Sequence, residues 1–174
     1  MKGSEPQSEH ARLARRVVES HVRGEDTSDV GEVTDELRRK RAGVFVCLKK
    51  DGELRGCIGT IEPVSPSIAE EIRGNAINSA TRDPRFLPVS TDELDRLTYS
   101  VDVLGEPEEI PDMSYLDPKD YGVIVRSGPR SGLLLPDLEG VDTAADQVRI
   151  AMMKAGIKSG EPVTLQRFKV TRHE

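Results

Sequence analysis

Residues 54–60, with the sequence LRGCIGT, place a cysteine in a setting that could support nucleophilic chemistry. A cysteine attacks as its thiolate, and a nearby cation, helix N-terminus or histidine is needed to lower the thiol pKa. Arg55 lies two residues before Cys57, so the two side chains share a face if the segment is a regular strand. The alternative is that Cys57 is a small apolar core residue, as free cysteines often are. The residue types alone favour this alternative.

The histidines of the chain do not offer Cys57 a general base. His10, His21 and His173 all lie near the chain ends, so a Cys/His pair would require a terminal segment to fold over the motif. Two cysteines without a neighbouring histidine are also too few ligands for a tetrahedral metal site. We therefore expect no metal and no other cofactor, and we expect any reactivity of Cys57 to depend on Arg55.

Two glycines bracket Cys57 and allow two interpretations. A glycine inside a strand often marks a bulge or a place where a ligand or another backbone comes close. Gly56 and Gly59 would in one case leave open space above Cys57 for a ligand. In the other case they would let a helix pack tightly on the sheet, and the sequence favours neither.

A second candidate group lies in the segment RDPRF, directly after a predicted helix. Arg85 could bind an anion, with its guanidinium oriented by Asp83. A structural Arg–Asp pair that closes the end of the helix explains the same two residues, and we favour it slightly. The glycine-rich segment RSGPRSG matches neither a P-loop nor a dinucleotide-binding pattern, because it follows a strand and does not open a helix.

The pairing of the first hairpin decides whether the two cysteines can meet. A two-residue turn at Asp51-Gly52 would place Val46 opposite Cys57 and turn Cys47 to the other face of the sheet. A three-residue loop over residues 50–52 would shift the register by one, so that Cys47 and Cys57 share a face as diagonal neighbours. Only the second register makes a redox pair possible, and the sequence leaves both open.

The pattern of apolar residues predicts an α+β fold with two lobes of mostly antiparallel sheet. Helices are expected over residues 8–24, 65–83 and 142–156, and hairpins over residues 43–61 and 121–138. Each hairpin opens alike, with GVFV and GVIV, and each is followed by a loop and a helix, which suggests a duplication. We therefore expect one domain over residues 1–174, with a first repeat at about 37–90 and a second at about 98–160. An extra N-terminal helix and a C-terminal strand complete it.

Two further details of the elements follow from residue types. Ser65 is the expected cap of the second long helix, with Pro66 at its first helical position. The alternation of residues 97–105, LTYSVDVLG, predicts a strand with Tyr99, Val101 and Val103 facing inward.

Composition limits the classes of partner. The chain has 174 residues, with 25 Lys and Arg against 31 Asp and Glu, which gives a formal net charge of −6. An acidic balance argues against general binding to nucleic acids or anionic membranes, both of which need a basic face. There is no apolar run long enough to span a membrane and no apolar region typical of a secretory signal. We expect a cytoplasmic protein that is not bound to a membrane.

Four blocks, LRGCIGT, RDPRF, YSVDVLGEPEEI and YGVIVRSG with RSGLLLP, occur in this order and resemble the AMMECR family from about residue 9 to residue 170. The resemblance implies two lobes with swapped structural repeats. It implies as partners a Memo-like protein, related to extradiol dioxygenases, and a radical S-adenosylmethionine protein, after which the bacterial members are named AmmeMemoRadiSam system protein A. It implies no established reaction. It marks as the presumed site the motif residues Leu54, Arg55, Gly56, Cys57, Ile58, Gly59 and Thr60.

These observations support three functional hypotheses. The first is a ligand-binding or catalytic component of a modification system, with Cys57 as the nucleophile and Arg55, Gly56, Gly59, Thr60 and Arg85 binding a small-molecule or RNA substrate. The second is a non-catalytic interaction or regulatory module that docks the two partner proteins. The third is an RNA-binding component, against which the charge of −6 and the few aromatic residues argue.

Overall fold

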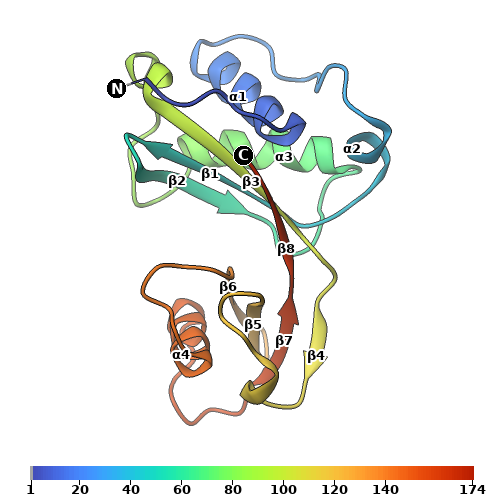
Figure 1. The fold of residues 1–174 in the computed structure, drawn as a ribbon, viewed down its shortest axis with the longest axis vertical. Coiled ribbons are helices and arrows are strands. Elements are labelled where there is room, and N and C mark those ends of the chain that lie inside the picture. The colour runs from blue at the N-terminus through green and yellow to red at the C-terminus, as the bar shows by residue number, and fades with distance from the viewer. Residues whose placement is uncertain (1) are drawn as a thin grey trace. The chain divides into compact units, whose positions relative to one another are not determined.

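The computed structural model describes residues 2–174, which fold into two compact units (Figure 1). Among the described residues, the first unit comprises residues 2–103 and the last four residues, Thr171–Glu174. The second unit is Leu104–Val170. None of the helices in the described part of the chain is both long enough and apolar enough to cross a membrane.

The first unit is a four-stranded sheet with helices, and the order of its strands is β2-β1-β3-β8. Its elements are α1 (Glu9–Val22), α2 (Asp35–Arg39), β1 (Val44–Lys50), β2 (Glu53–Gly59), α3 (Ile68–Thr81), the 3-10 helix η1 (Thr91–Arg96), β3 (Leu97–Leu104) and β8 (Val170–His173).

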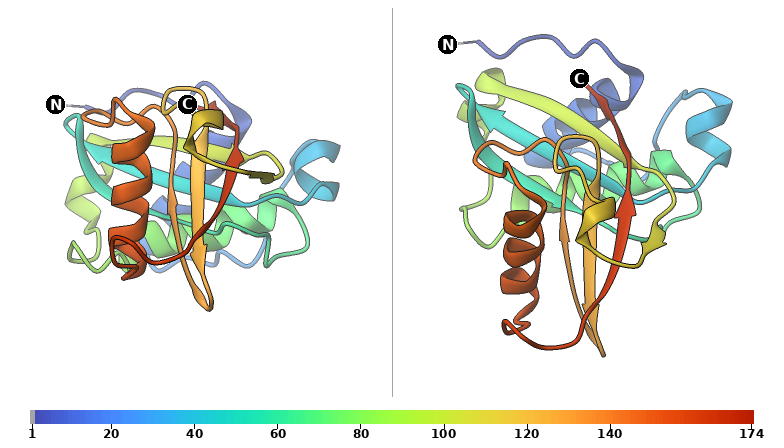
Figure 2. Two further views of the ribbon diagram at one scale, coloured as in Figure 1. Left: turned by 90° about the horizontal axis from the view of Figure 1, so that it is seen from below. Right: turned by 60° about the horizontal axis from the view of Figure 1, so that its bottom comes forward.

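The second unit is a smaller four-stranded sheet with one long helix, and its strand order is β4-β7-β5-β6. Its elements are β4 (Glu108–Ile110), the 3-10 helix η2 (Met113–Tyr115), β5 (Gly122–Ser127), β6 (Arg130–Leu134), α4 (Ala144–Ala155) and β7 (Thr164–Phe168). Figure 2 shows α4 lying along the β5–β6 hairpin, against which it packs.

The two sheets repeat one connection. In the first, the hairpin β1–β2 is followed by α3 and then β3, which pairs antiparallel with β1. In the second, the hairpin β5–β6 is followed by α4 and then β7, which pairs antiparallel with β5. The fourth strand of each sheet is exchanged, because β4 follows β3 but pairs with β7, and β8 follows β7 but lies beside β3. This confirms the predicted α+β fold built from two hairpin-plus-helix repeats.

The core of the first unit lies between its sheet and α3. The buried side chains of β1 alternate, with Val44, Val46 and Leu48 facing inward, as expected for a sheet covered on one face. α3 packs on β1 and β2, and α1 packs in turn on α3. On β3, Tyr99 and Val101 are buried as predicted.

The start of α3 differs from the prediction. Ser67, and not Ser65, is the N-cap, and its hydroxyl accepts a hydrogen bond from the Glu70 amide at 3.2 Å. The Ser65 amide is instead bound by the buried carboxylate of Glu71, at 2.8 Å. A carboxylate from the first turn of α3 thus binds Ser65 outside the helix that its residue type would cap.

The two chain ends meet at a pair of histidines in the first unit. The ring of His10, on α1, stacks on the ring of His173, on β8, with centroids 3.6 Å apart. Burial, and next the positive charge that His173 can carry, lower the pKa of His10, while Glu9 and Glu36 oppose this shift. A histidine pKa that is lower in the folded state gives stability above the unfolded-state pKa, and that stability is lost as the pH falls.

We therefore expect the free energy of unfolding to fall between about pH 7 and pH 5, where an unperturbed histidine titrates near 6.5. His10→Gln should flatten this dependence in urea titrations followed by circular dichroism. His21→Gln replaces an exposed histidine on the same helix and is the matched control for the substitution itself. An equal slope in the wild type and His10→Gln would contradict the prediction.

Candidate functional site

A bulge in the first hairpin brings the two cysteines together. The turn has two residues, because Lys50 pairs with Glu53 and both Asp51 and Gly52 have positive φ. The register then shifts by one residue: Lys49 pairs with Leu54, but Leu48 pairs with Gly56, so Arg55 is the extra residue of a bulge.

Neither register considered from the sequence is therefore correct. The turn has the predicted two residues, yet Cys47 lies directly opposite Cys57, and the two share a face. Their Cα atoms are 4.1 Å apart and their sulfurs form a disulfide. In this state Cys57 has no thiolate, so the nucleophile hypothesis applies only to a reduced form. The bulge also interrupts the two-residue period that predicted Arg55 beside Cys57.

Arg55 is held by a buried carboxylate of η1. Its Nε and Nη2 atoms donate to Glu93 at 2.9 and 3.0 Å, and Lys50 donates to the same carboxylate at 2.8 Å. The side chains of Arg55 and Glu93 are only 13% and 11% exposed. Arg55, and after it Lys50, hold the pKa of Glu93 well below its usual range. The guanidinium of Arg55 thus has an internal partner.

The segment RDPRF closes the outer edge of β2 at the motif. The amide of Cys57 donates to Asp83 at 3.0 Å, and Nη2 of Arg85 donates to the carbonyl oxygen of Cys57 at 3.4 Å. Arg85 also donates to Asp83 through Nε and Nη2, at 2.9 and 2.7 Å, and holds the pKa of this carboxyl well below its usual range. These contacts match the structural Arg–Asp pair, and they occupy backbone groups that an edge strand would otherwise leave free.

Phe86 lies beside both arginines of the predicted site. Its ring centroid is 5.8 Å from the guanidinium carbon of Arg55 and 5.5 Å from that of Arg85, within the range of cation–π attraction. The structure thus places Arg55 and Arg85 beside the same aromatic ring. Each arginine is also paired with a carboxylate, Arg55 with Glu93 and Arg85 with Asp83. Sequence reasoning quoted Phe86 within RDPRF but gave it no role.

The glycines serve packing. A Cβ atom built at Gly56 would collide with the carbonyl oxygen of Ser79 on α3, so the helix backbone rests on this residue. A Cβ at Gly59 would collide with the ring of Phe45, its partner on β1. α3 fills the space at Gly56, on the face of the sheet opposite the Cys47 and Cys57 side chains, so the tight-packing alternative holds for Gly56. Gly59 instead makes room for Phe45 on the neighbouring strand.

The second unit repeats the glycine that lies under a helix, and it also has a glycine that faces a phenylalanine ring on a neighbouring strand. A Cβ at Gly132 on β6 would meet the carbonyl oxygen of Ala151 on α4, and one at Gly122 would meet the ring of Phe168. Close approach of a helix backbone to a strand glycine therefore belongs to both repeats. This supports a structural origin for part of the motif.

Thr60 contacts a stripe of buried polar side chains on α3, formed by Glu71, Asn75 and Ser79. Its hydroxyl donates to Glu71 at 2.6 Å and accepts from Asn75 at 3.2 Å. Ser79 continues the stripe, accepting from the Ile58 amide at 2.9 Å and donating to the Val46 carbonyl at 2.6 Å. Sequence reasoning missed this stripe, although its signal was present: three polar residues at intervals of four on an otherwise apolar helix face.

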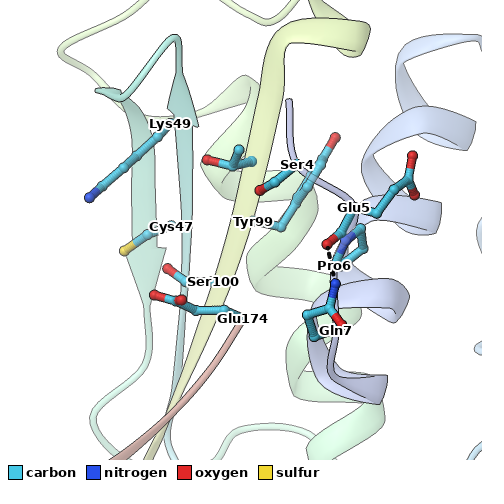
Figure 3. Close-up of a pocket in the computed structure, with 10 residues that line it drawn as sticks. Ser4, Glu5, Pro6, Gln7, Cys47, Lys49, Tyr99, Ser100 and Glu174 are labelled. Atoms are coloured by element: carbon cyan, nitrogen blue, oxygen red, sulfur yellow. Dashed lines mark hydrogen bonds between the residues drawn. The ribbon is translucent and has the colours of Figure 1, made fainter. Parts of the chain in front are cut away.

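A polar pocket of about 310 Å³ opens beside Cys47 in the first unit (Figure 3). Cys47, Lys49 and Ser100 contribute side chains from β1 and β3. The remaining lining comes from Thr98, Tyr99, the N-terminal residues Ser4, Glu5, Pro6 and Gln7, and Glu174. Arg55, Cys57 and Arg85 do not line it. Among the described residues, no group of three or more His, Cys, Asp or Glu side chains is arranged to hold a metal ion.

Known proteins resemble this chain over almost its whole length. A Thermotoga maritima protein is 54% identical over 168 residues, which cover 95% of this chain and 97% of that protein. A Clostridium acetobutylicum protein is 51% identical over 167 residues, which cover 95% of this chain but only 36% of that longer protein.

A solved structure and a family model agree with these relatives. The crystal structure of an uncharacterized protein from Pyrococcus horikoshii matches with a TM-score of 0.86 and 32% identity, over 94% of this chain and 88% of that one. The family model described as AMMECR1 matches residues 11–173. This chain, in which the two sheets exchange their fourth strands, therefore belongs to the AMMECR1 family.

Proposed function

We propose that this chain is a non-catalytic interaction module of a multi-protein modification system. The observation that carries the proposal is that the Arg55, Cys57 and Thr60 side chains each have a partner within the fold, although the Nη1 atom of Arg55 is buried without a hydrogen bond. Arg55 is paired with Glu93, Thr60 with Glu71, and the sulfur of Cys57 with that of Cys47. A catalytic or ligand-binding motif would be expected to leave such groups facing a pocket.

The apolar surface of the first unit supports docking at the motif edge. Large apolar side chains that are exposed in this unit belong to segments around β2: Leu54 is 42%, Val64 78% and Leu87 83% exposed. Leu54 lies on β2, Val64 in the loop after it, and Leu87 two residues after Arg85, which bonds to β2. These side chains are spread along β2 and the segments beside it, and we propose that a partner protein contacts them there. We call Leu54, Val64 and Leu87 the docking surface.

The partners we propose are the Memo-like protein and the radical S-adenosylmethionine protein that the family resemblance implies. The Clostridium relative supports a role in association with other protein regions. In that longer protein the region similar to this chain makes up only 36% of the length. An RNA partner is less well supported, since the arginines near the motif already have carboxylate partners.

Binding of the two proteins to a Leu87→Glu variant tests the proposal. We expect at least about a tenfold loss of affinity in calorimetric titrations, because a charge would enter the buried centre of the contact. Met153→Glu is the matched control: Met153 is 65% exposed but lies in the second unit, and its change should not alter the affinity. Unchanged binding by Leu87→Glu would contradict the docking surface.

The absence of catalysis is tested separately. A Cys47→Ser, Cys57→Ser double variant should bind both partners with the affinity of the wild type and should support the activity of the assembled system. If binding stays intact but the system loses activity, the non-catalytic assignment is wrong.

A further inference from the structure

We infer that Cys47 and Cys57 form a reversible thiol–disulfide exchange site, which a small thiol or disulfide reaches through the polar pocket at Cys47. The two residues are paired across neighbouring strands and their sulfurs are bonded. The inference does not rest on the docking proposal, because none of the residues of the docking surface takes part in it.

Cys47 and Cys57 are both half-buried, but only Cys47 faces the pocket. Cys47 lines the pocket of about 310 Å³, together with Lys49 and Ser100, whereas Cys57 does not line it. In Figure 3 the side chains of Cys47, Lys49 and Ser100 point to the same side of the sheet. Because exchange requires an incoming thiolate to reach one of the two sulfurs, the sulfur of Cys47 is the one attacked and that of Cys57 is the leaving group.

The sheet keeps the two thiols together after reduction. Cys47 lies on β1, which is paired on both sides, with Cys57 of β2 and with Ser100 of β3. The backbone of Cys57 is fixed in addition by Asp83 and Arg85. Since none of these contacts involves a sulfur atom, breaking the disulfide leaves them in place. Reoxidation is then a reaction between groups already held in position.

The exchange proceeds in two balanced steps with a small thiol as the reductant. Its thiolate attacks Sγ of Cys47, a mixed disulfide forms, the Cys47–Cys57 bond breaks, and Cys57 leaves as a thiolate that takes up a proton. A second thiolate then attacks the reductant's sulfur in the mixed disulfide and releases Cys47 as a thiol. Two electrons pass to the protein, and the reductant leaves as its disulfide. The reverse reaction oxidises the dithiol with a small disulfide.

Equilibration of the complete chain with glutathione and glutathione disulfide tests the site. Samples are quenched with acid, and free thiols are counted by mass after alkylation under denaturing conditions. We expect a single two-electron transition, reached equally from the oxidised and the reduced side, with an unchanged far-UV spectrum. The site is refuted if the disulfide opens only after the chain is unfolded in urea. It is equally refuted if the thiols stay reduced in glutathione disulfide alone.

The route of entry is tested with two single variants. Glutathione disulfide should form a mixed disulfide with Cys47 in Cys57→Ser at least roughly tenfold faster than with Cys57 in Cys47→Ser, because access governs the rate. Thermal unfolding checks that both variants fold. If one does not, limited alkylation of the reduced wild type, followed by peptide mapping, gives the same comparison. Equal rates, or faster reaction at Cys57, would overturn entry through the pocket.

Discussion

Replacing Gly56 with alanine is expected to lower the free energy of unfolding by about 3 kcal/mol, at the upper end of the cost of overpacking a core. The added Cβ would collide with the carbonyl oxygen of Ser79, and this atom belongs to the backbone of α3. A backbone carbonyl cannot rotate away as a long side chain can, so the helix or the strand must move. Urea unfolding followed by circular dichroism measures the change.

Two other glycines provide matched comparisons. Gly74 lies on α3 itself, but a Cβ built there meets nothing within 4 Å, so Gly74→Ala should stabilise the chain by about 0.5–1 kcal/mol through helix propensity. Gly132→Ala should destabilise the second unit much as Gly56→Ala destabilises the first, because it meets the carbonyl oxygen of Ala151. Tolerance of alanine at Gly56 would mean that the helix does not rest on the strand there.

Replacing Glu93 with glutamine is expected to lower the free energy of unfolding by about 2–3 kcal/mol. This is somewhat less than the cost of removing one partner from a fully buried ion pair, because Lys50, the second cation bound to Glu93, is partly exposed to solvent. Glutamine is close in shape to glutamate but carries no charge. The Arg55 side chain, which is only 13% exposed, would then remain buried without the carboxylate of Glu93 to balance its charge. Asp35→Asn is the matched control, since its pair with Arg39 has side chains that are 81% and 77% exposed. That change should cost less than about 1 kcal/mol.

Acid provides a second measurement of the same ion pair. The pKa of Glu93 is lower in the folded chain, first through the hydrogen bonds from Arg55, so its stabilisation is present above the unfolded-state pKa. It is lost as the pH falls below about 4, where an unperturbed glutamate takes up a proton. Glu93→Gln should therefore lose less stability than the wild type between about pH 4 and pH 2. A loss equal to that of the wild type would show that the carboxylate contributes little.

Much of the fold could be predicted because its signals are local. Apolar side chains every three to four residues predict helices, and alternation predicts strands. The pair Asp51 and Gly52 predicts a two-residue turn because such a turn requires positive φ, which these residue types tolerate. In the structure both residues have positive φ. The repeated order of hairpin and helix likewise predicted two similar sheets. The cap of α3 was predicted wrongly at Ser65, because Ser67 caps the helix and the Glu71 carboxylate of its first turn binds the Ser65 amide.

The sequence by itself determined the elements, their repetition and the residues of the motif, because these depend on neighbours in the chain. The tertiary structure alone decided what the motif residues contact. One bulge at Arg55 moved Cys47 opposite Cys57, and a one-residue shift of this kind reverses the face of each side chain beyond it. The side chain of Arg55, the α-carbon of Gly56 and the amide of Cys57 contact Glu93, Ser79 and Asp83, which lie more than 20 positions away along the chain. Such contacts form only when distant segments pack together, so local residue patterns do not specify them.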